Sequence, residues 1–173
     1  MALYNQQAPT RRKVFISYHH GNDQACYNEF SRVFHDQFEL LTDNSLEREI
    51  DSGNFEYIMR RIREYHLHGS SCTLVLCGAA TPRRRYVDWE IHASLAQNMG
   101  LVGIGLPTIQ WTGPNSTWKP ARLQDNIDTG YAGWTLWDQI IANPSLLISE
   151  IEASVQLRGV GISNHRPRMT RNE

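Results

Sequence analysis

Long hydrophobic runs, paired cysteines and an excess of charge of either sign are all missing from this sequence. No apolar run approaches the roughly 20 residues that a bilayer-spanning helix needs. The opening stretch MALYNQQAPTRRK contains no apolar segment typical of a secretory signal. We therefore expect a cytoplasmic protein without a membrane partner. The 17 basic and 18 acidic side chains nearly cancel, so the composition gives no sign of a nucleic-acid partner either.

The cysteine content also agrees with the expected cytoplasmic location. Cys26, Cys72 and Cys77 make an odd count, which favours reduced thiols in a chain without a secretory signal. Cys72 and Cys77 lie in one strand-like run, and their odd separation puts them on opposite faces of the strand. They are therefore not expected to bind one metal ion. His66 and His68 lack partner carboxylates at a defined spacing, so no metal site is predicted.

The chain alternates strand-like and helical patterns. With 173 residues, of which 40% are apolar, it is long enough for one domain with a core. Strands are predicted at 14–17, 73–76 and 101–109. Amphipathic helices are predicted from residues 22–23 to 41 and at 55–65, 87–99 and 143–155. This alternation predicts an α/β sandwich with a mostly parallel central sheet.

The domain boundaries follow from the same patterns. We expect an N-terminal extension at 1–12, one folded domain at 13–157, and a flexible C-terminal tail at 158–173, where no periodicity is left. Ligands of such sheets bind beyond the carboxyl ends of the strands. The loops at 17–23 and 78–86 are therefore the candidate binding loops.

Three segments, in this order and spacing, carry a family resemblance. The first is KVFISYHH at 13–20, and the second is the run 71–78 with Thr81 and Pro82 just beyond it. The third is YVDWEI at 86–91, in which Tyr86 stands where the family pattern often has tryptophan. Together they resemble the opening strand and loop, the central strand, and the W-V-x-W-E-I helix of TIR-like domains of the bacterial Thoeris antiviral type. The resemblance covers approximately residues 13–110.

The resemblance implies a flavodoxin-like, TIR-like three-layer fold, NAD as a substrate rather than a cofactor, and Glu90 as the catalytic glutamate. In such systems the TIR-like protein responds to phage infection and makes a cyclic signal derived from ADP-ribose. A separate effector protein reads that signal. NAD and this effector are thus the expected partners, and the resemblance leaves open a phage-derived trigger and a homo-oligomer.

The chemistry of NAD suits a single carboxylate. Nicotinamide leaves as a neutral molecule and needs no general acid, unlike the leaving group of an ordinary glycoside. A carboxylate can stabilise the oxocarbenium-like transition state by its charge. Glu90 lies at the border of the apolar stripe of its helix. On helical geometry alone, an acid in a first turn needs no function, because it interacts favourably with the helix dipole. The family resemblance favours the catalytic interpretation.

Further substrate contacts are expected around Glu90. Ser17, Tyr18, His19 and His20 follow the first strand and could stack on a base or bond a ribose or phosphate oxygen; a solvated turn is the competing interpretation. Ser52 could belong to a loop that covers the nucleotide, or it could cap a helix. Arg83 could bind the pyrophosphate through its guanidinium, or it could be simply solvated.

Two other functions fit an α/β domain of this size. The first is a non-catalytic TIR-like scaffold that assembles through its surfaces, with Glu90 idle. The second is a phosphoacceptor domain, which needs acidic residues at the ends of the first and central strands. Those ends read Ser17-Tyr18 and Cys77-Gly78, which disfavours the phosphoacceptor. The sequence predicts an NAD-processing enzyme, with the scaffold as the alternative.

Overall fold

The computed structural model describes residues 11–42 and 54–173. The predicted extension therefore lies outside the described residues except at its last two positions. The segment 43–53 lies outside them as well, and with it the candidate substrate residue Ser52.

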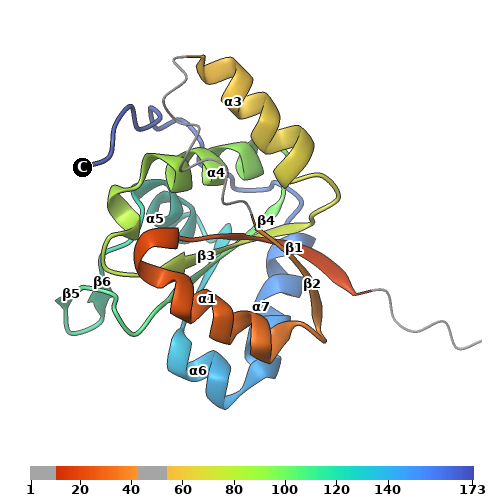
Figure 1. The fold of residues 1–173 in the computed structure, drawn as a ribbon, viewed down its shortest axis with the longest axis vertical. Helices are drawn as coiled ribbons and strands as arrows, with labels where there is room; N and C mark the ends of the chain where they lie inside the picture. The colour runs from red at the N-terminus through yellow and green to blue at the C-terminus, as the bar shows by residue number, and fades with distance from the viewer. Residues whose placement is uncertain (1–10, 43–53) are drawn as a thin grey trace, which may run out of the picture.

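Five parallel strands form the central sheet (Figure 1). Their spatial order is β2-β1-β3-β4-β7. The strands are β1 (Arg12–Ser17), β2 (Phe38–Leu41), β3 (Cys72–Cys77), β4 (Gly100–Gly105) and β7 (Ala132–Leu136). This is the flavodoxin-like order, in which the chain reverses direction across the sheet beside the first strand. The predicted α/β class with a parallel sheet is confirmed.

Helices cover both faces of the sheet and make the other two layers (Figure 1). One face carries α3 (Phe55–Arg61), α4 (Arg85–Ala96) and α5 (Ala121–Asp128). The opposite face carries α1 (His20–Phe34), α6 (Trp137–Ala142) and α7 (Pro144–Gln156). Each layer has its own apolar cluster. Cys77 belongs to the first cluster and Cys72 to the second, so the prediction that they lie on opposite faces is confirmed.

The first predicted helix is too long. α1 ends at Phe34, and Phe38–Leu41 form the edge strand β2, which pairs with β1. Phe34 and Phe38 both pack into the core, so their four-residue spacing resembles a continued helical stripe. The helix also begins at His20 and without a side-chain cap, which is earlier than the predicted start at residues 22–23.

Residues 111–137, which contain four of the five tryptophans, form more regular secondary structure than the sequence predicted. They form a hairpin of β5 (Trp111–Gly113) and β6 (Ser116–Thr117), then α5, and then β7, which pairs with β4. Gly100 does not end the preceding helix. It is the first residue of β4, and Asn98 takes the left-handed conformation after α4 with φ of 56°.

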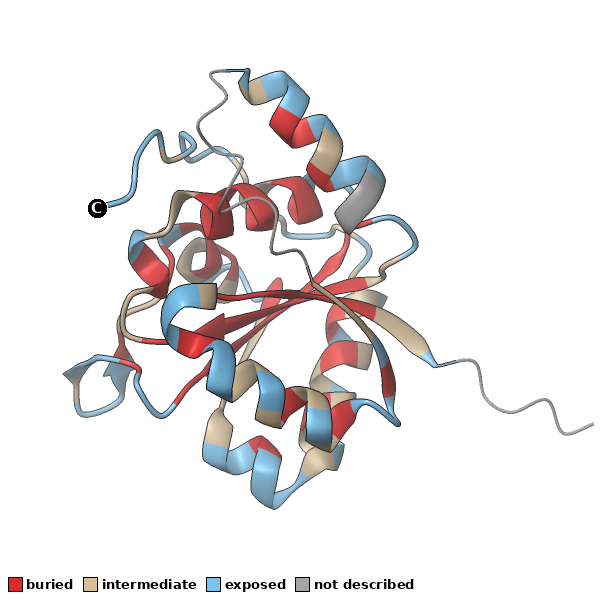
Figure 2. Cartoon of the chain, in the orientation of Figure 1, coloured by how far each residue is buried: buried red, intermediate tan, exposed pale blue. Residues whose placement is uncertain are grey.

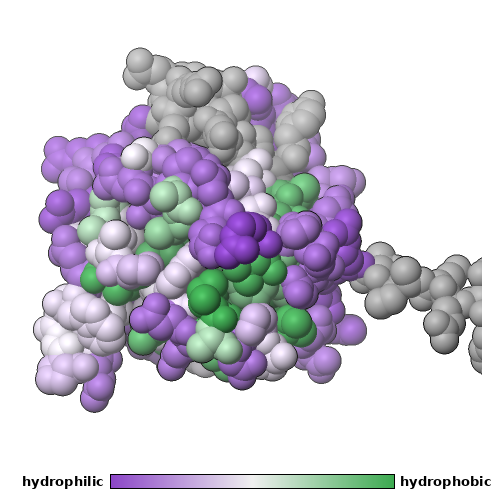
Figure 3. Space-filling view, turned by 60° about the horizontal axis from the view of Figure 1, so that its bottom comes forward, coloured by the Kyte–Doolittle hydropathy of each residue, from purple (hydrophilic) through white to green (hydrophobic). Residues whose placement is uncertain are grey.

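One face of the molecule is mainly polar in its described part (Figure 3). On the face seen in Figure 3, most of the described surface is hydrophilic, and apolar side chains gather only in small areas. Within 11–42 and 54–173, no helix is long and apolar enough to span a bilayer. The apolar side chains of the strands instead fill the two layers between sheet and helices.

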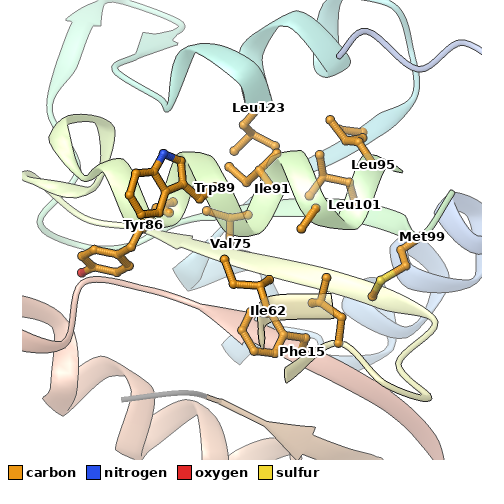
Figure 4. Close-up of a cluster of buried hydrophobic side chains, with 14 of the residues drawn as sticks. Phe15, Ile62, Val75, Tyr86, Trp89, Ile91, Leu95, Met99, Leu101 and Leu123 are labelled. Atoms are coloured by element: carbon orange, nitrogen blue, oxygen red, sulfur yellow. The ribbon is translucent and has the colours of Figure 1, made fainter. Parts of the chain in front are cut away.

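Helix α4 is buried on nearly all sides (Figure 2). Its apolar residues Tyr86, Trp89, Ile91 and Leu95 pack over the strand residues of the first cluster (Figure 4). Its polar residues Asp88, Glu90 and Ser94 are buried too, with exposed fractions of at most 4%. Since a buried polar group without a partner costs about 1–3 kcal/mol, each of these three needs a hydrogen-bond partner.

Asp88 finds its partner in α5. The guanidinium of Arg122 donates two hydrogen bonds to its carboxylate, with N···O distances of 2.8 and 3.2 Å. The side chain of Arg122 is 0% exposed and that of Asp88 is 5% exposed. Asp88 also accepts from the backbone N–H of Met169 at 2.9 Å. This bidentate pair therefore joins α4 to α5 and to the C-terminal segment.

The segment after α7 contacts α4 and α5. Arg122 donates to the carbonyl of Pro167 at 3.2 Å, and the indole N–H of Trp89 donates to the carbonyl of Met169 at 2.8 Å. The guanidinium of Arg168 lies 3.4 Å from the ring centroid of Phe55 in α3. The expectation of a flexible tail at 158–173 did not anticipate these contacts, because they come from isolated polar side chains that show no sequence period.

We predict that Arg122→Met lowers the free energy of unfolding by about 3–5 kcal/mol, because it leaves the Asp88 carboxylate buried without its counter-charge. Denaturant unfolding measures this value. Arg166→Met is the matched control: Arg166 pairs with Asp125 in the same bidentate way, but both side chains are largely solvent-accessible. Its loss should cost less than about 1 kcal/mol. Equal losses in both variants would contradict the assignment.

A second prediction concerns the close packing of β4. A Cβ atom at Gly103 would lie 2.6 Å from a ring carbon of Trp134 and 2.7 Å from a methyl of Leu123. Gly103→Ala should therefore destabilise the protein by about 1–3 kcal/mol. Thermal unfolding would show a decrease of about 2–4 °C per kcal/mol. Gly113→Ala, whose new methyl would meet only Ser116 at 3.8 Å, should change the melting temperature little.

Candidate functional site

The carboxylate of Glu90 lies between α4 and the carboxyl end of β1. The hydroxyl of Ser17, the last residue of β1, donates to its Oε2 at 2.5 Å. Glu90 is 2% exposed and Ser17 is 1% exposed. The two buried side chains are therefore in direct hydrogen-bond contact. The structure thus brings together the expected catalytic residue and one of the expected substrate residues.

The backbone around Glu90 is fixed by a second polar contact. Ser94 donates from its hydroxyl to the carbonyl of Glu90 at 2.7 Å, and its Oγ lies 2.6 Å from the hydroxyl of Thr73 in β3. All three residues are buried. Helix α4 is therefore tied to two neighbouring strands, through Ser17 and through Thr73, on either side of the carboxylate.

The residues that follow Ser17 are less accessible than the sequence indicated. Tyr18 is 1% exposed, and its ring stacks on Tyr27 of α1 at 4.7 Å and contacts the ring of His20 at 4.0 Å. His19 is 6% exposed. His20 is half-buried at the start of α1. Of the expected stacking residues, His20 keeps the most surface, whereas Tyr18 acts mainly as a packing residue.

Tyr86 was not expected at the site. Its hydroxyl donates to the carbonyl of Tyr18 at 3.4 Å, and its ring centroid lies 6.5 Å from that of His20. It precedes Glu90 by four residues, so both side chains project from the same side of α4. The sequence signal was present, since Tyr86 occupies a family motif position, but only the fold places it beside the first loop.

Arg83 and Arg85, just before α4 and at its start, contact groups outside the Glu90 site. The guanidinium of Arg83 lies 4.7 Å from the ring centroid of Trp118. Arg85 donates to the carbonyl of Thr170 at 3.2 Å and lies 5.5 Å from the ring of Trp89. Arg83 thus contacts Trp118 and, through its backbone carbonyl, Glu173, rather than Ser17 or Glu90.

The sequence also did not predict a buried acid, Asp23, which lies in the first turn of α1 beside the end of β3. Asp23 is 2% exposed, and burial raises the pKa of its carboxyl group. It accepts from the hydroxyl of Thr81 at 3.4 Å, and a Cβ atom at Gly78 would overlap with its carboxylate. The two candidate loops are therefore packed against each other through Asp23 and Gly78.

Nothing in the described residues indicates a metal centre. No group of three or more histidine, cysteine, aspartate or glutamate side chains gathers within 11–42 and 54–173. Burial raises the pKa of the Cys72 thiol to about 12 and also raises that of Cys77, which keeps both thiols protonated. The polar groups near the end of β1 are a carboxylate, a hydroxyl and imidazoles, from Glu90, Ser17, His19 and His20.

The chain was compared with protein families, curated proteins and solved structures. A solved structure, the TIR domains of the activated Roq1 resistosome directly recognising the pathogen effector XopQ, aligns with a TM-score of 0.39 and 12% sequence identity. The alignment covers 87% of this chain and 86% of that chain. No curated protein matches the sequence. The family model of the TIR-like domain of the Thoeris protein ThsB matches residues 15–110, from β1 through β4. As that match covers more than half of the 173 residues, the chain belongs to the Thoeris ThsB TIR-like domain family.

Proposed function

We propose that this TIR-like defence protein cleaves NAD at the bond between nicotinamide and ribose, with Glu90 as the catalytic carboxylate. The observation that carries the proposal is the buried hydrogen bond from Ser17 to Glu90 at the carboxyl end of β1. Ligands of open parallel sheets bind at this edge. A carboxylate in a site with little water exerts a stronger electrostatic effect than it would in solution.

The reaction needs few groups. The C1′–N bond breaks with its electron pair going to the nicotinamide nitrogen, which neutralises the positive ring and leaves a ribosyl oxocarbenium. The negative charge of Glu90 stabilises that cation. Water or a nucleophile within the ADP-ribose product then forms the new bond at C1′ and releases a proton. A cyclic product would serve as the signal to a partner effector protein.

We also propose roles for the residues around Glu90. Ser17 orients the Glu90 carboxylate through its hydroxyl. Half-buried His20 offers ring surface beside the first loop, and the buried ring of Tyr86 packs next to it. With Glu90 2% exposed, a nucleotide has to displace neighbouring groups to reach it. We therefore expect low activity in the resting protein and higher activity after a trigger.

We predict that Glu90→Gln lowers the rate of product formation by about 10²–10³, the effect typical of removing one electrostatic stabiliser. Glutamine keeps the size of the side chain and can still accept from Ser17, so stability should change little. Mass spectrometry of nicotinamide and ADP-ribose-derived products from phage-infected cells measures the effect. The control is Glu64→Gln, at an exposed glutamate in the π-helical turn Ile62–His66.

Product formation and phage protection in these variants distinguish an NAD-cleaving enzyme from a non-catalytic scaffold. A scaffold that assembles through its surfaces would give the same product signal in wild type, Glu90→Gln and Glu64→Gln, namely the background of the cells. It would still protect against phage in all three. Protection that is lost together with product formation in Glu90→Gln alone supports the enzyme. Equal products from wild type and Glu90→Gln would remove Glu90 from the mechanism.

A further inference from the structure

A pocket of about 690 Å³ lies beside α4 on the side of the C-terminal segment. It is formed by the 3₁₀ turn η2 (Thr81–Arg83) and the start of α4, by the residues just before α5, and by the last residues of the chain. Its lining includes Arg84, Trp118, Lys119, Arg168, Arg171 and Glu173. In the view of Figure 1, the C-terminal segment passes close to α4 and α5, where this pocket lies.

This pocket is separate from the candidate catalytic site. Asp88 lines it, and Glu90 follows two residues later on the same helix. Two residues turn an α-helix by about 200°, so the side chains of Asp88 and Glu90 project from nearly opposite sides. Arg122 and Met169 contact Asp88, whereas Ser17 contacts Glu90.

The lining carries an excess of positive charge. The Asp88 carboxylate is already neutralised by Arg122, and Arg166 is paired with Asp125. Four other cations line the pocket and form no ion pair with any residue in the described part of the chain: Arg84, Lys119, Arg168 and Arg171. Glu173 is the acidic lining residue that remains. An anion would therefore be attracted to this pocket.

Arg84 supplies an observation that points to a ligand. Its Nε is buried and has no hydrogen-bond partner in the described structure. Buried donors in folded proteins are nearly always satisfied by protein, water or an ion. Lys119 lies 4.4 Å from the ring centroid of Trp134, and burial lowers the pKa of its ammonium group. A bound anion would satisfy the guanidinium of Arg84 and favour the charged form of Lys119.

The remaining walls are apolar and flat. Trp118, Pro82, Pro120 and Pro167 line the pocket, and its volume falls in the range of small-molecule sites. We propose that this pocket binds a nucleotide, with its phosphates on Arg84 and Lys119 and its base against Trp118. It is a second nucleotide site, in addition to the proposed NAD site at Glu90, and it stands independently of that proposal.

Titration calorimetry with ADP at low salt tests the site. The double variant Arg84→Gln with Lys119→Gln should weaken ADP binding more than about tenfold, because charge-assisted bonds to phosphate are lost. Neither side chain caps a helix, and circular dichroism checks that the variants are folded. Arg171→Gln, at an exposed position, provides an independent variant with a smaller expected loss. The matched control is Arg60→Gln on the exposed side of α3, which should bind like wild type.

Two further measurements distinguish the pocket from the Glu90 site and the nucleotide from a simple anion. Glu90→Gln should bind ADP as wild type does. Inorganic pyrophosphate should bind more weakly than ADP, and Trp118→Leu should remove that difference by losing affinity for ADP alone.

Several results would overturn the proposal. One is the absence of saturable ADP binding. Another is binding that survives in the Arg84→Gln, Lys119→Gln double variant but disappears in Glu90→Gln, which would place ADP at the other site. Equal affinities for ADP and pyrophosphate in the wild-type protein would refute the role of a base on Trp118.

Discussion

The pairing of Asp88 with Arg122 is the interaction on which the structure around α4 depends. A helix this deeply buried has to satisfy its polar side chains inside the protein, since an uncompensated buried charge costs several kcal/mol. Asp88 obtains its partner from α5 and a further hydrogen bond from Met169. The pair thereby fixes the position of α5 and of the C-terminal segment relative to α4. These parts come from distant regions of the chain, and one carboxylate brings them together.

Helix α4 also carries Glu90, so the contacts that fix this helix also fix the proposed catalytic carboxylate. Asp88 and Glu90 face different partners on nearly opposite sides of α4, Arg122 on one and Ser17 on the other. With Ser94 bound to Thr73 as well, the helix cannot rotate without breaking several buried contacts. A catalytic carboxylate benefits from such a rigid support, because misplacement by about 1 Å is enough to impair a designed or natural site. The proposed chemistry at Glu90 therefore rests on contacts made elsewhere along the helix.

The sequence predicted those elements of the fold whose apolar residues are continuous or regularly spaced. The buried strand β3 and the helix around Glu90 follow from continuous or regularly spaced apolar residues. Glu90 and Ser17 were both predicted as site residues, from a family motif and from the rule that ligands bind at strand ends, but the hydrogen bond between them was not predicted. Arg122 was not foreseeable, because a buried arginine looks like a surface residue until its carboxylate is located. Phe38 was misassigned for a related reason: the short apolar run of an edge strand can continue a helical spacing.

The region matched by the family model does not complete the fold by itself. Residues 15–110 include Asp88 and β4, but the partners of both lie further along the chain. Arg122 belongs to α5, β7 pairs with β4, and α7 covers Val102 and Ile104 in the second apolar cluster. Without these elements, Asp88 would be a buried charge without a partner, and β4 would become an exposed edge strand. The residues beyond the matched region therefore belong to the same structural unit as Glu90, and they hold its helix in place.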